Sequence, residues 1–405
     1  MIATAKPKEL RRVGPEHEEI TRGFEKPIGQ DKLDVIAKAG MKFAIVCDDI
    51  TRPTPVHKIV PTLIEKLDAA GIRSEDIYII VGVGTHPRHT CDQNVKKLGQ
   101  AVLDRFNVIS HDIDGDLIYL GETSRGTPVH VNRRFAEADV KLGIGNLAPH
   151  PFSGYGGGPK TIVGICGRET IMCNHRFVKD DRCQLGLLKG NPVYEDIVEI
   201  ARKASLHMIV NTLLDSEGRI ARLFVGDPVE AHGKGVEVLE KACKVILPTL
   251  AEVVVTSSFP FDDYFYQSWK GIFSAALTCK QGGTIILSAP CRMGVQDEHY
   301  KLLTENRLFK ITSDEIYEKV EKGEIKPYII GLITYKLRSS IGDREVIIVT
   351  RGIEERKIRD MGFRYASDLD EAFQMAKAKH RTANLVVLPF GAETLPIVSG
   401  QDFGC

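Results

Sequence analysis

Residues 139–160 read DVKLGIGNLAPHPFSGYGGGPK, and the rest of the chain is organised around them. An apolar run from Val140 to Ile144 predicts a strand, which leads into a loop that contains His150, four glycines and Lys160. Glycine tolerates positive φ angles and lets a backbone approach a ligand closely. His175 follows after a short apolar segment. This stretch therefore predicts a strand-and-loop unit that presents two imidazoles and one amine beside an accessible backbone.

The loop taken alone has two other interpretations. The phosphate-binding pattern G-x-x-x-x-G-K-[ST] requires a glycine before the lysine, but Pro159 stands before Lys160. Because proline has no amide N–H to offer a phosphate, a phosphate-binding loop is disfavoured. An ordinary surface turn with an exposed lysine stays open as the alternative.

The composition is typical of a globular protein with more than one domain. A chain of 405 residues exceeds the roughly 250–300 at which one core stops growing. The 54 Lys and Arg balance the 54 Asp and Glu, so neither nucleic acid nor an anionic membrane is expected as the main partner. No apolar run reaches the roughly 18–20 residues that a membrane helix needs. Nine cysteines without a C-x-x-C pair, and a start that lacks the apolar core of a signal peptide, predict reduced thiols and a cytoplasmic location.

Short apolar runs alternate with amphipathic segments along the whole chain, which predicts an α/β fold with largely parallel sheets. We expect two α/β domains, at residues 1–247 and 248–390, with the active site in the cleft between them. The tail at residues 391–405 is expected to pack back onto the first domain.

Polar side chains follow two predicted strands of the first domain. Asp49 and Arg52 come after a strand at residues 42–47, at the end where open α/β sheets bind ligands. An N-cap aspartate with a surface arginine is the alternative. His111-Asp112 follow residues 108–110 and could act as a general base with a nearby carboxylate. A hydrogen-bonded loop histidine is the alternative for His111.

His86 and His89 stand three residues apart after a strand at residues 77–82. A metal site is disfavoured because Pro87 separates them and no third ligand is near in sequence. We expect His86 to be hydrogen-bonded locally and assign it no catalytic role.

Residues 259–270 read FPFDDYFYQSWK and contain the chain's single tryptophan. If a helix begins here, Gln267 and Lys270 share one face, with Tyr266 beside them. An aromatic cap with Trp269 in the core is the structural alternative, and the two are compatible.

This inventory suits a small hydroxy-carboxylate that reacts at the carbon beside its carboxylate. Two imidazoles can remove and return protons near neutral pH. Arginine can clamp a carboxylate with two hydrogen bonds, and lysine adds a point charge. A third histidine remains free to ligate a metal.

These residues lie in motifs that resemble those of the nickel-dependent lactate racemase family of 2-hydroxyacid racemases and epimerases. The motifs follow the family's order and spacing over essentially the whole chain. They are Asp49-Ile50-Thr51-Arg52-Pro53, His111-Asp112, the run from Pro149 to Lys160, Asn174-His175, and Tyr266-Gln267-Ser268-Trp269-Lys270. Relatives usually have a further strand ahead of the region like residues 7–30, so the chain is expected to start late.

The resemblance implies a nickel-pincer nucleotide, a pyridinium mononucleotide that holds nickel through two sulfur-bearing arms and a ring carbon. It implies covalent attachment of this group to Lys160 through a thioamide, and His175 as a nickel ligand. It also implies that His111 and His150 are the acid/base pair. The remaining implied contacts are Gly156, Gly157, Gly158 and Tyr266 for the cofactor, and Asp49, Arg52, Gln267 and Lys270 for the substrate.

In the implied reaction, hydride moves reversibly from C2 onto the lysine-tethered nickel-pincer nucleotide while one histidine takes the hydroxyl proton, and hydride returns to the other face of the planar 2-oxo acid. The expected partners are a small 2-hydroxy acid and the enzymes that make the cofactor. Two other functions stay open: a non-catalytic carrier of the cofactor or a metal, and, less favoured, a nucleotide-dependent phosphotransferase. Arg52, His111 and His150 favour the racemase, because a carrier has no use for acid/base histidines.

Overall fold

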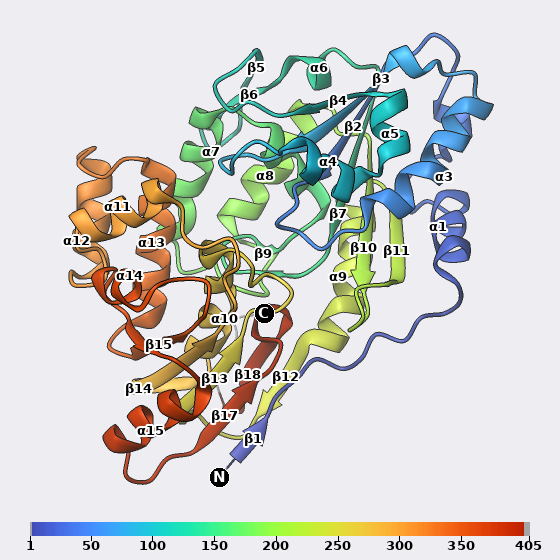
Figure 1. The fold of residues 1–405 in the computed structure, drawn as a ribbon. Helices are drawn as coiled ribbons and strands as arrows, with labels where there is room; N and C mark the ends of the chain where they lie inside the picture. The colour runs from blue at the N-terminus through green and yellow to red at the C-terminus, as the bar shows by residue number, and fades with distance from the viewer. Residues whose placement is uncertain (1, 401–405) are drawn as a thin grey trace.

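The computed structural model describes residues 2–400. Two six-stranded sheets organise the molecule, one above the other in Figure 1. The first sheet contains, in spatial order, β11 (Ile220–Gly226), β10 (Met208–Leu214), β7 (Val140–Asn146), β2 (Phe43–Asp48), β3 (Ile77–Gly82) and β4 (Asn107–Ser110). The second contains β1 (Ile2–Thr4), β17 (Leu385–Leu388), β13 (Ala251–Ser257), β14 (Cys279–Ser288), β15 (Glu345–Val349) and β16 (Arg364–Ala366). Neighbouring strands are parallel except for the antiparallel pair β10–β11, which confirms the predicted α/β class.

Helices pack on both faces of each sheet, as expected for parallel sheets whose crossovers are helical. Those around the first sheet are α1 (Glu16–Glu25), α2 (Leu33–Ile36), η1 (Ser74–Asp76), α3 (Val56–Ala69), α4 (Cys91–Leu98), α5 (Gln100–Arg105), α6 (Arg133–Ala136), η2 (Gly158–Ile165), α7 (Arg168–His175), η3 (Arg176–Lys179), α8 (Pro192–Lys203) and α9 (Glu230–Cys243). Those around the second are α10 (Phe265–Ala276), α11 (Asp297–Glu305), α12 (Ser313–Glu321), α13 (Tyr328–Ile341), α14 (Glu355–Asp360), α15 (Leu369–Lys379) and η4 (Gly391–Glu393). No helix within residues 2–400 is long and apolar enough to cross a membrane.

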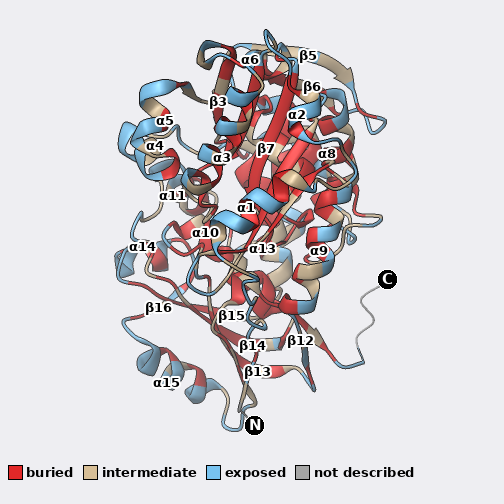
Figure 2. Ribbon diagram, turned by 90° about the vertical axis from the view of Figure 1, so that its right-hand side faces the viewer, coloured by how far each residue is buried: buried red, intermediate tan, exposed pale blue. Residues whose placement is uncertain are grey.

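The central strands are buried on both faces. All seven residues of β7 are buried, and Figure 2 shows this strand in red while α4 and α5 expose their outer surfaces. Along β2 the side chains alternate: Ala44 and Val46 join one hydrophobic cluster, while Phe43 and Ile45 join another on the opposite face. This alternation follows from the two-residue period of a strand.

One hydrophobic cluster continues from the first domain into the second. It contains Val46 and Ile80 of the first sheet, Phe273 of α10, and Ile285 of the second sheet. The two domains therefore share a core where they meet, and the surfaces beside that contact are held in a defined arrangement.

Three short strand pairs lie outside the large sheets. They are β5 (Leu117–Glu122) with β6 (Pro128–Asn132), β8 (Pro149–His150) with β9 (Gly154–Tyr155), and β12 (Lys244–Leu247) with β18 (Leu395–Val398). Strand β18, near the end of the described chain, pairs in parallel with β12, which directly precedes β13 of the second sheet. Leu395 packs in one cluster with Leu147 and Tyr155 of the first domain. Residues 401–405 of the predicted tail lie outside the described part of the chain.

The beginning of the chain differs from the expectation. Residues 2–4 form β1, which pairs with β17 at the edge of the second sheet rather than joining the first domain. In Figure 1 the chain then runs across to α1 beside the first sheet. A strand therefore does precede residues 7–30. Its three residues carry too little pattern to reveal a partner more than 380 positions away in sequence.

Candidate active site

A cavity of about 190 Å³ lies where the two domains meet. The loops that form one wall follow β2, β3 and β7, the three adjacent central strands of the first sheet, and α10 provides the opposite wall. Carboxyl ends of neighbouring parallel strands converge at one edge, which is where open α/β sheets bind ligands. The polar lining includes Asp49, Arg52, His86, His150, Lys160, His175, Tyr266, Gln267 and Lys270, together with Asp48, Thr85, Asn146, Thr161 and the backbone of Gly156 and Gly157.

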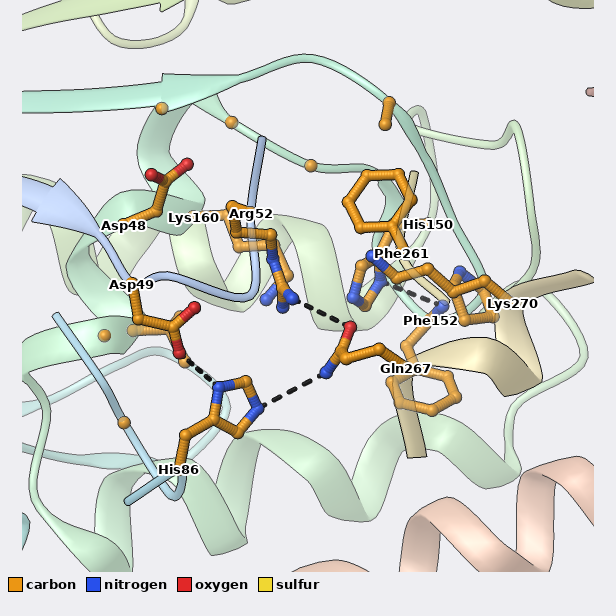
Figure 3. Close-up of a pocket in the computed structure, with 18 of the residues that line it drawn as sticks. Asp48, Asp49, Arg52, His86, His150, Phe152, Lys160, Phe261, Gln267 and Lys270 are labelled. Carbon is orange, nitrogen blue, oxygen red and sulfur yellow. Dashed lines mark hydrogen bonds and ion pairs between the residues drawn. The ribbon is translucent and has the colours of Figure 1, made fainter. Parts of the chain in front are cut away.

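A chain of hydrogen bonds crosses from one domain to the other (Figure 3). Nδ1 of His86 donates to the carboxylate of Asp49, which leaves Nε2 as an acceptor that faces Nε2 of Gln267 at 3.4 Å. The other end of that amide, Oε1, accepts from Arg52 at 2.7 Å. Burial raises the pKa of Asp49, but the charge and hydrogen bond of His86 outweigh it and hold the pKa well below its usual range. Asp49 is therefore a carboxylate that orients His86, so that Nε2 of the ring faces the Gln267 amide in the cavity lining.

His150 is oriented by the backbone. It ends the short strand β8, and its Nδ1 lies 3.3 Å from the backbone N–H groups of both Phe152 and Ser153, which donate to it. The neutral ring therefore carries its proton on Nε2, which faces the cavity as a hydrogen-bond donor. Burial, followed by the charges of Lys160 and Lys270, lowers the pKa of His150 well below the ordinary value.

Three cationic side chains surround the cavity. Burial and the charge of Arg52 lower the pKa of Lys160 to about 8. Burial and the charges of Arg52 and Lys160 also lower the pKa of Lys270 well below its usual value. The nearby carboxyl of Glu393 compensates little, because burial raises its pKa to about 7 against the opposing effect of Lys270. An anion bound here would relieve the mutual repulsion of Arg52, Lys160 and Lys270, so the cavity favours an anionic ligand.

His175 has the geometry of a metal ligand with one nitrogen already engaged. Nδ1 donates to the carbonyl oxygen of Ile171, one turn earlier in α7, at 2.9 Å. Burial, followed by the charge of Lys160, lowers the pKa of His175 to about 4, so the ring is neutral at pH 7. A backbone carbonyl that holds one N–H while the other nitrogen keeps its lone pair is the usual arrangement of a ligating histidine. Within residues 2–400, no group of three or more His, Cys, Asp or Glu side chains is placed to hold a metal ion.

The structure does not bring His111 to the cavity, and this corrects its assignment as an acid/base residue. His111 is 1% exposed, and its Nε2 contacts the carbonyl oxygen of Cys166 at 3.0 Å. It follows β4, which is the edge strand of the sheet, so its position lies one strand beyond the converging loops. Burial lowers the pKa of His111 despite the hydrogen bond to Cys166. The alternative of a hydrogen-bonded loop histidine describes it better.

Gly158 also lies outside the cavity lining, unlike Gly156 and Gly157. It begins η2 with a φ of 56° and packs against His232 instead. Gly158 therefore contributes to the loop through its positive φ angle and not through the cavity lining.

His86 is the residue that sequence analysis placed wrongly. It was expected to be locally bonded, yet its partners Asp49 and Gln267 come from another strand end and from the other domain. A signal was present: Asp49 follows β2 and His86 follows β3, and these strands are neighbours. Recognising that their ends meet requires the strand order, which one sequence does not reveal.

Two family descriptions account for most of the chain. "Lactate racemase N-terminal domain" matches residues 1–186, and "Lactate racemase C-terminal domain" matches residues 247–395. The chain belongs to the lactate racemase family. This membership confirms the resemblance inferred from the motifs.

Individual lactate racemases are similar over nearly the whole length. The lactate racemase of Lactiplantibacillus plantarum is 30% identical over 386 residues, which are 93% of this chain and 90% of that protein. The lactate racemase of Thermoanaerobacterium thermosaccharolyticum is 29% identical over 391 residues, 94% of this chain and 90% of that protein. The solved structure of the latter's apoprotein superposes with a TM-score of 0.85 at 27% identity, covering 98% of this chain and 94% of that one. A Thermotoga maritima protein shares the fold, with a TM-score of 0.75 at 19% identity and coverage of 95% and 98%.

Proposed function

We propose that this lactate racemase family member is a racemase or epimerase of a 2-hydroxy acid, with a nickel-pincer nucleotide attached at Lys160. The observation that carries the proposal is the convergence of two oriented imidazoles, three cationic side chains and a metal-ligand histidine in one interdomain cavity. Lactate, the substrate named for the relatives, is the first compound to test.

The residues fit such a cofactor on three counts. The amine of Lys160 has a pKa of about 8, so a substantial fraction is neutral near pH 7–8 and can form an amide-type bond. His175 keeps one nitrogen free, and a metal at that nitrogen would need its other ligands from a bound group. One water needs about 10–15 Å³ of cavity volume. The cavity of about 190 Å³ is therefore larger than a three-carbon acid alone requires.

The cationic side chains would bind the substrate carboxylate. Arg52 is held by Gln267 and by Oγ1 of Thr51, which accepts from Arg52 at 2.9 Å, and Lys270 stands near it on α10. A planar guanidinium can make two parallel hydrogen bonds to a carboxylate. With one end fixed, C2 and its hydroxyl would be presented to the imidazoles.

His86 and His150 would move the hydroxyl proton. The Asp49–His86 pair presents a lone pair at Nε2 and can stabilise the imidazolium that forms when a proton is taken. His150 presents its Nε2–H to the cavity from the first domain's loop. In Figure 3, Arg52 and Gln267 are drawn between these two imidazoles. Two imidazoles are needed because the hydroxyl of each enantiomer points in a different direction from a common carboxylate anchor.

When bound, the nickel-pincer nucleotide supplies a reversible hydride acceptor, which avoids forming a carbanion beside a carboxylate. The protein contributes orientation and charge stabilisation. The enzymes that make the cofactor are the partners this proposal requires. A carrier of the cofactor is the remaining alternative, and the oriented Asp49–His86 pair favours catalysis over it.

The test is a chirality-resolved turnover assay with a panel of 2-hydroxy acids, using protein co-expressed with the cofactor-making enzymes. We expect inversion at C2 of at least one acid and an intact-mass adduct that maps to Lys160. An adduct without inversion of any panel member would favour the carrier. An unmodified chain from that host would contradict the assignment of Lys160.

A further inference from the structure

Two side chains that are not part of the described cavity lining form hydrogen bonds with the backbone of the loop segment Gly156–Gly158. We propose that His232 and Asn211 are positioning residues that clamp this segment and thereby set where His150 and Lys160 stand relative to each other. His232 comes from α9 and Asn211 from β10, so the clamp is anchored in the scaffold of the first domain.

His232 holds the first glycine of the segment. Its Nε2 donates to the carbonyl oxygen of Gly156 at 3.1 Å, and its Nδ1 accepts from the hydroxyl of Tyr194 at 3.2 Å. The ring is fully buried, and burial lowers its pKa to about 4. A neutral imidazole has one donor and one acceptor nitrogen, and here each has one partner. His232 is therefore fixed in one tautomer and one orientation.

Asn211 holds the last glycine of the segment. Its Oδ1 accepts from the backbone N–H of Gly158 at 2.7 Å, and its Nδ2 donates to the carbonyl oxygen of Gly145 on β7 at 3.4 Å. Without this side chain the N–H of Gly158 would be buried and unpaired, which is costly. Asn211, itself fully buried, thus ties the loop to the central sheet.

The clamp also leaves no room for a side chain on Gly157 or Gly158. A Cβ on Gly158 would lie 2.3 Å from Cγ of His232, and one on Gly157 would lie 2.9 Å from Oδ1 of Asn211. Gly158 has a φ of 56°, in the left-handed region that favours glycine. The backbone therefore packs directly on the imidazole and the amide.

The segment joins the two groups that face the cavity. On one side, Gly154 pairs with His150 in the hairpin β8–β9. On the other side, the backbone N–H of Lys160 donates to the carbonyl oxygen of Gly157 at 3.1 Å. A displacement of residues 156–158 would move both, and sites lose activity when supporting contacts leave them about an ångström out of place. This consequence for catalysis rests on the proposed function.

The test uses protein made without the cofactor pathway, so that Lys160 is free. Acetylation of Lys160 by acetic anhydride is measured against pH by peptide mass spectrometry, with hydrogen exchange of the peptide at residues 154–161. Wild type should show half-maximal labelling near pH 8. His232→Leu should raise this midpoint by on the order of one pH unit, because a released loop admits water to the amine, and should speed exchange by on the order of tenfold. His232→Gln, which retains an N–H donor, should restore both values.

A lower melting temperature with an unchanged labelling midpoint and unchanged exchange in residues 154–161 would overturn the inference, since a merely structural role predicts that result. If His232→Leu does not fold, Tyr194→Phe tests the same network by removing the hydroxyl that donates to Nδ1 of His232. Faster exchange in residues 154–161 supports the clamp, and wild-type exchange there overturns it. Neither measurement needs turnover, so failure here is distinct from failure of the proposed function.

Discussion

Replacing His86 and His111 by the same residue separates a catalytic histidine from a structural one. His86→Gln should reduce turnover of the cofactor-loaded protein by on the order of 10²–10⁴-fold, the usual contribution of a general acid/base group. Glutamine keeps an N–H that can donate to the Asp49 carboxylate, but it has no nitrogen lone pair to accept a proton. His111→Gln should leave turnover close to that of wild type.

The substitution at His86 is expected to change the activation free energy of the reaction, and the substitution at His111 the free energy of unfolding. At about 1.36 kcal/mol per tenfold, the loss at His86 corresponds to roughly 3–5 kcal/mol of transition-state stabilisation. At His111, glutamine can still donate to the Cys166 carbonyl that lies 3.0 Å from Nε2. Ring packing in a site that is 1% exposed and the contact of Nδ1 with Nδ2 of Asn132 at 3.4 Å are then lost, which should lower the free energy of unfolding by about 1–2 kcal/mol.

Turnover is followed by chiral chromatography of both enantiomers, and stability by urea denaturation of the same preparations. Nickel content of each variant is the control, since neither glutamine replaces His175. Near-normal racemisation by His86→Gln would refute the reasoning. So would a large loss in His111→Gln at unchanged stability, which would restore His111 to the mechanism.

Three further outcomes test the charges and the chemistry. Lys160 has a folded-state pKa of about 8 against an ordinary value of 10.5, so its burial costs about 3 kcal/mol below pH 8 and nothing above about pH 10.5. Lys160→Met should therefore raise the melting temperature of cofactor-free protein at pH 7, with the gain shrinking as pH rises through this range; a gain independent of pH would contradict that cause. Arg52→Lys should raise KM by on the order of tenfold with a smaller effect on kcat, because the charge is kept and the planar fork is lost; an unchanged KM would remove Arg52 from carboxylate binding. Substrate deuterated at C2 should keep most of its label after inversion, and rapid loss to water would indicate proton abstraction instead.

Much of the scaffold was readable from local pattern. The apolar run at residues 77–82 is β3 with the bounds predicted, and the run at residues 140–144 lies within β7. These elements are decided by side chains close in sequence, where buried positions recur with the period of the element. The strand β1 was missed because its three residues gain their meaning from pairing with β17.

The site was only partly readable. Arg52, His150, Lys160, His175, Gln267 and Lys270 were identified from the motifs and line one cavity. The adjacent His111-Asp112 pair is visible in the sequence, whereas Asp49, the partner of His86, lies 37 positions earlier. The clamp of Asn211 and His232 left no local signal, since both reach the glycine loop from distant elements.

The sequence by itself determined the α/β class, the positions of the strands β2, β3, β4 and β7, and the family through its ordered motifs. Only the tertiary structure decided which histidine faces the cavity. The physical reason is strand order: β2, β3 and β7 are neighbours, so the residues that follow them meet, while β4 lies at the edge and leaves His111 against Cys166. The order of strands within a sheet is set by packing between residues that are far apart in the sequence. A single sequence therefore does not reveal the strand order.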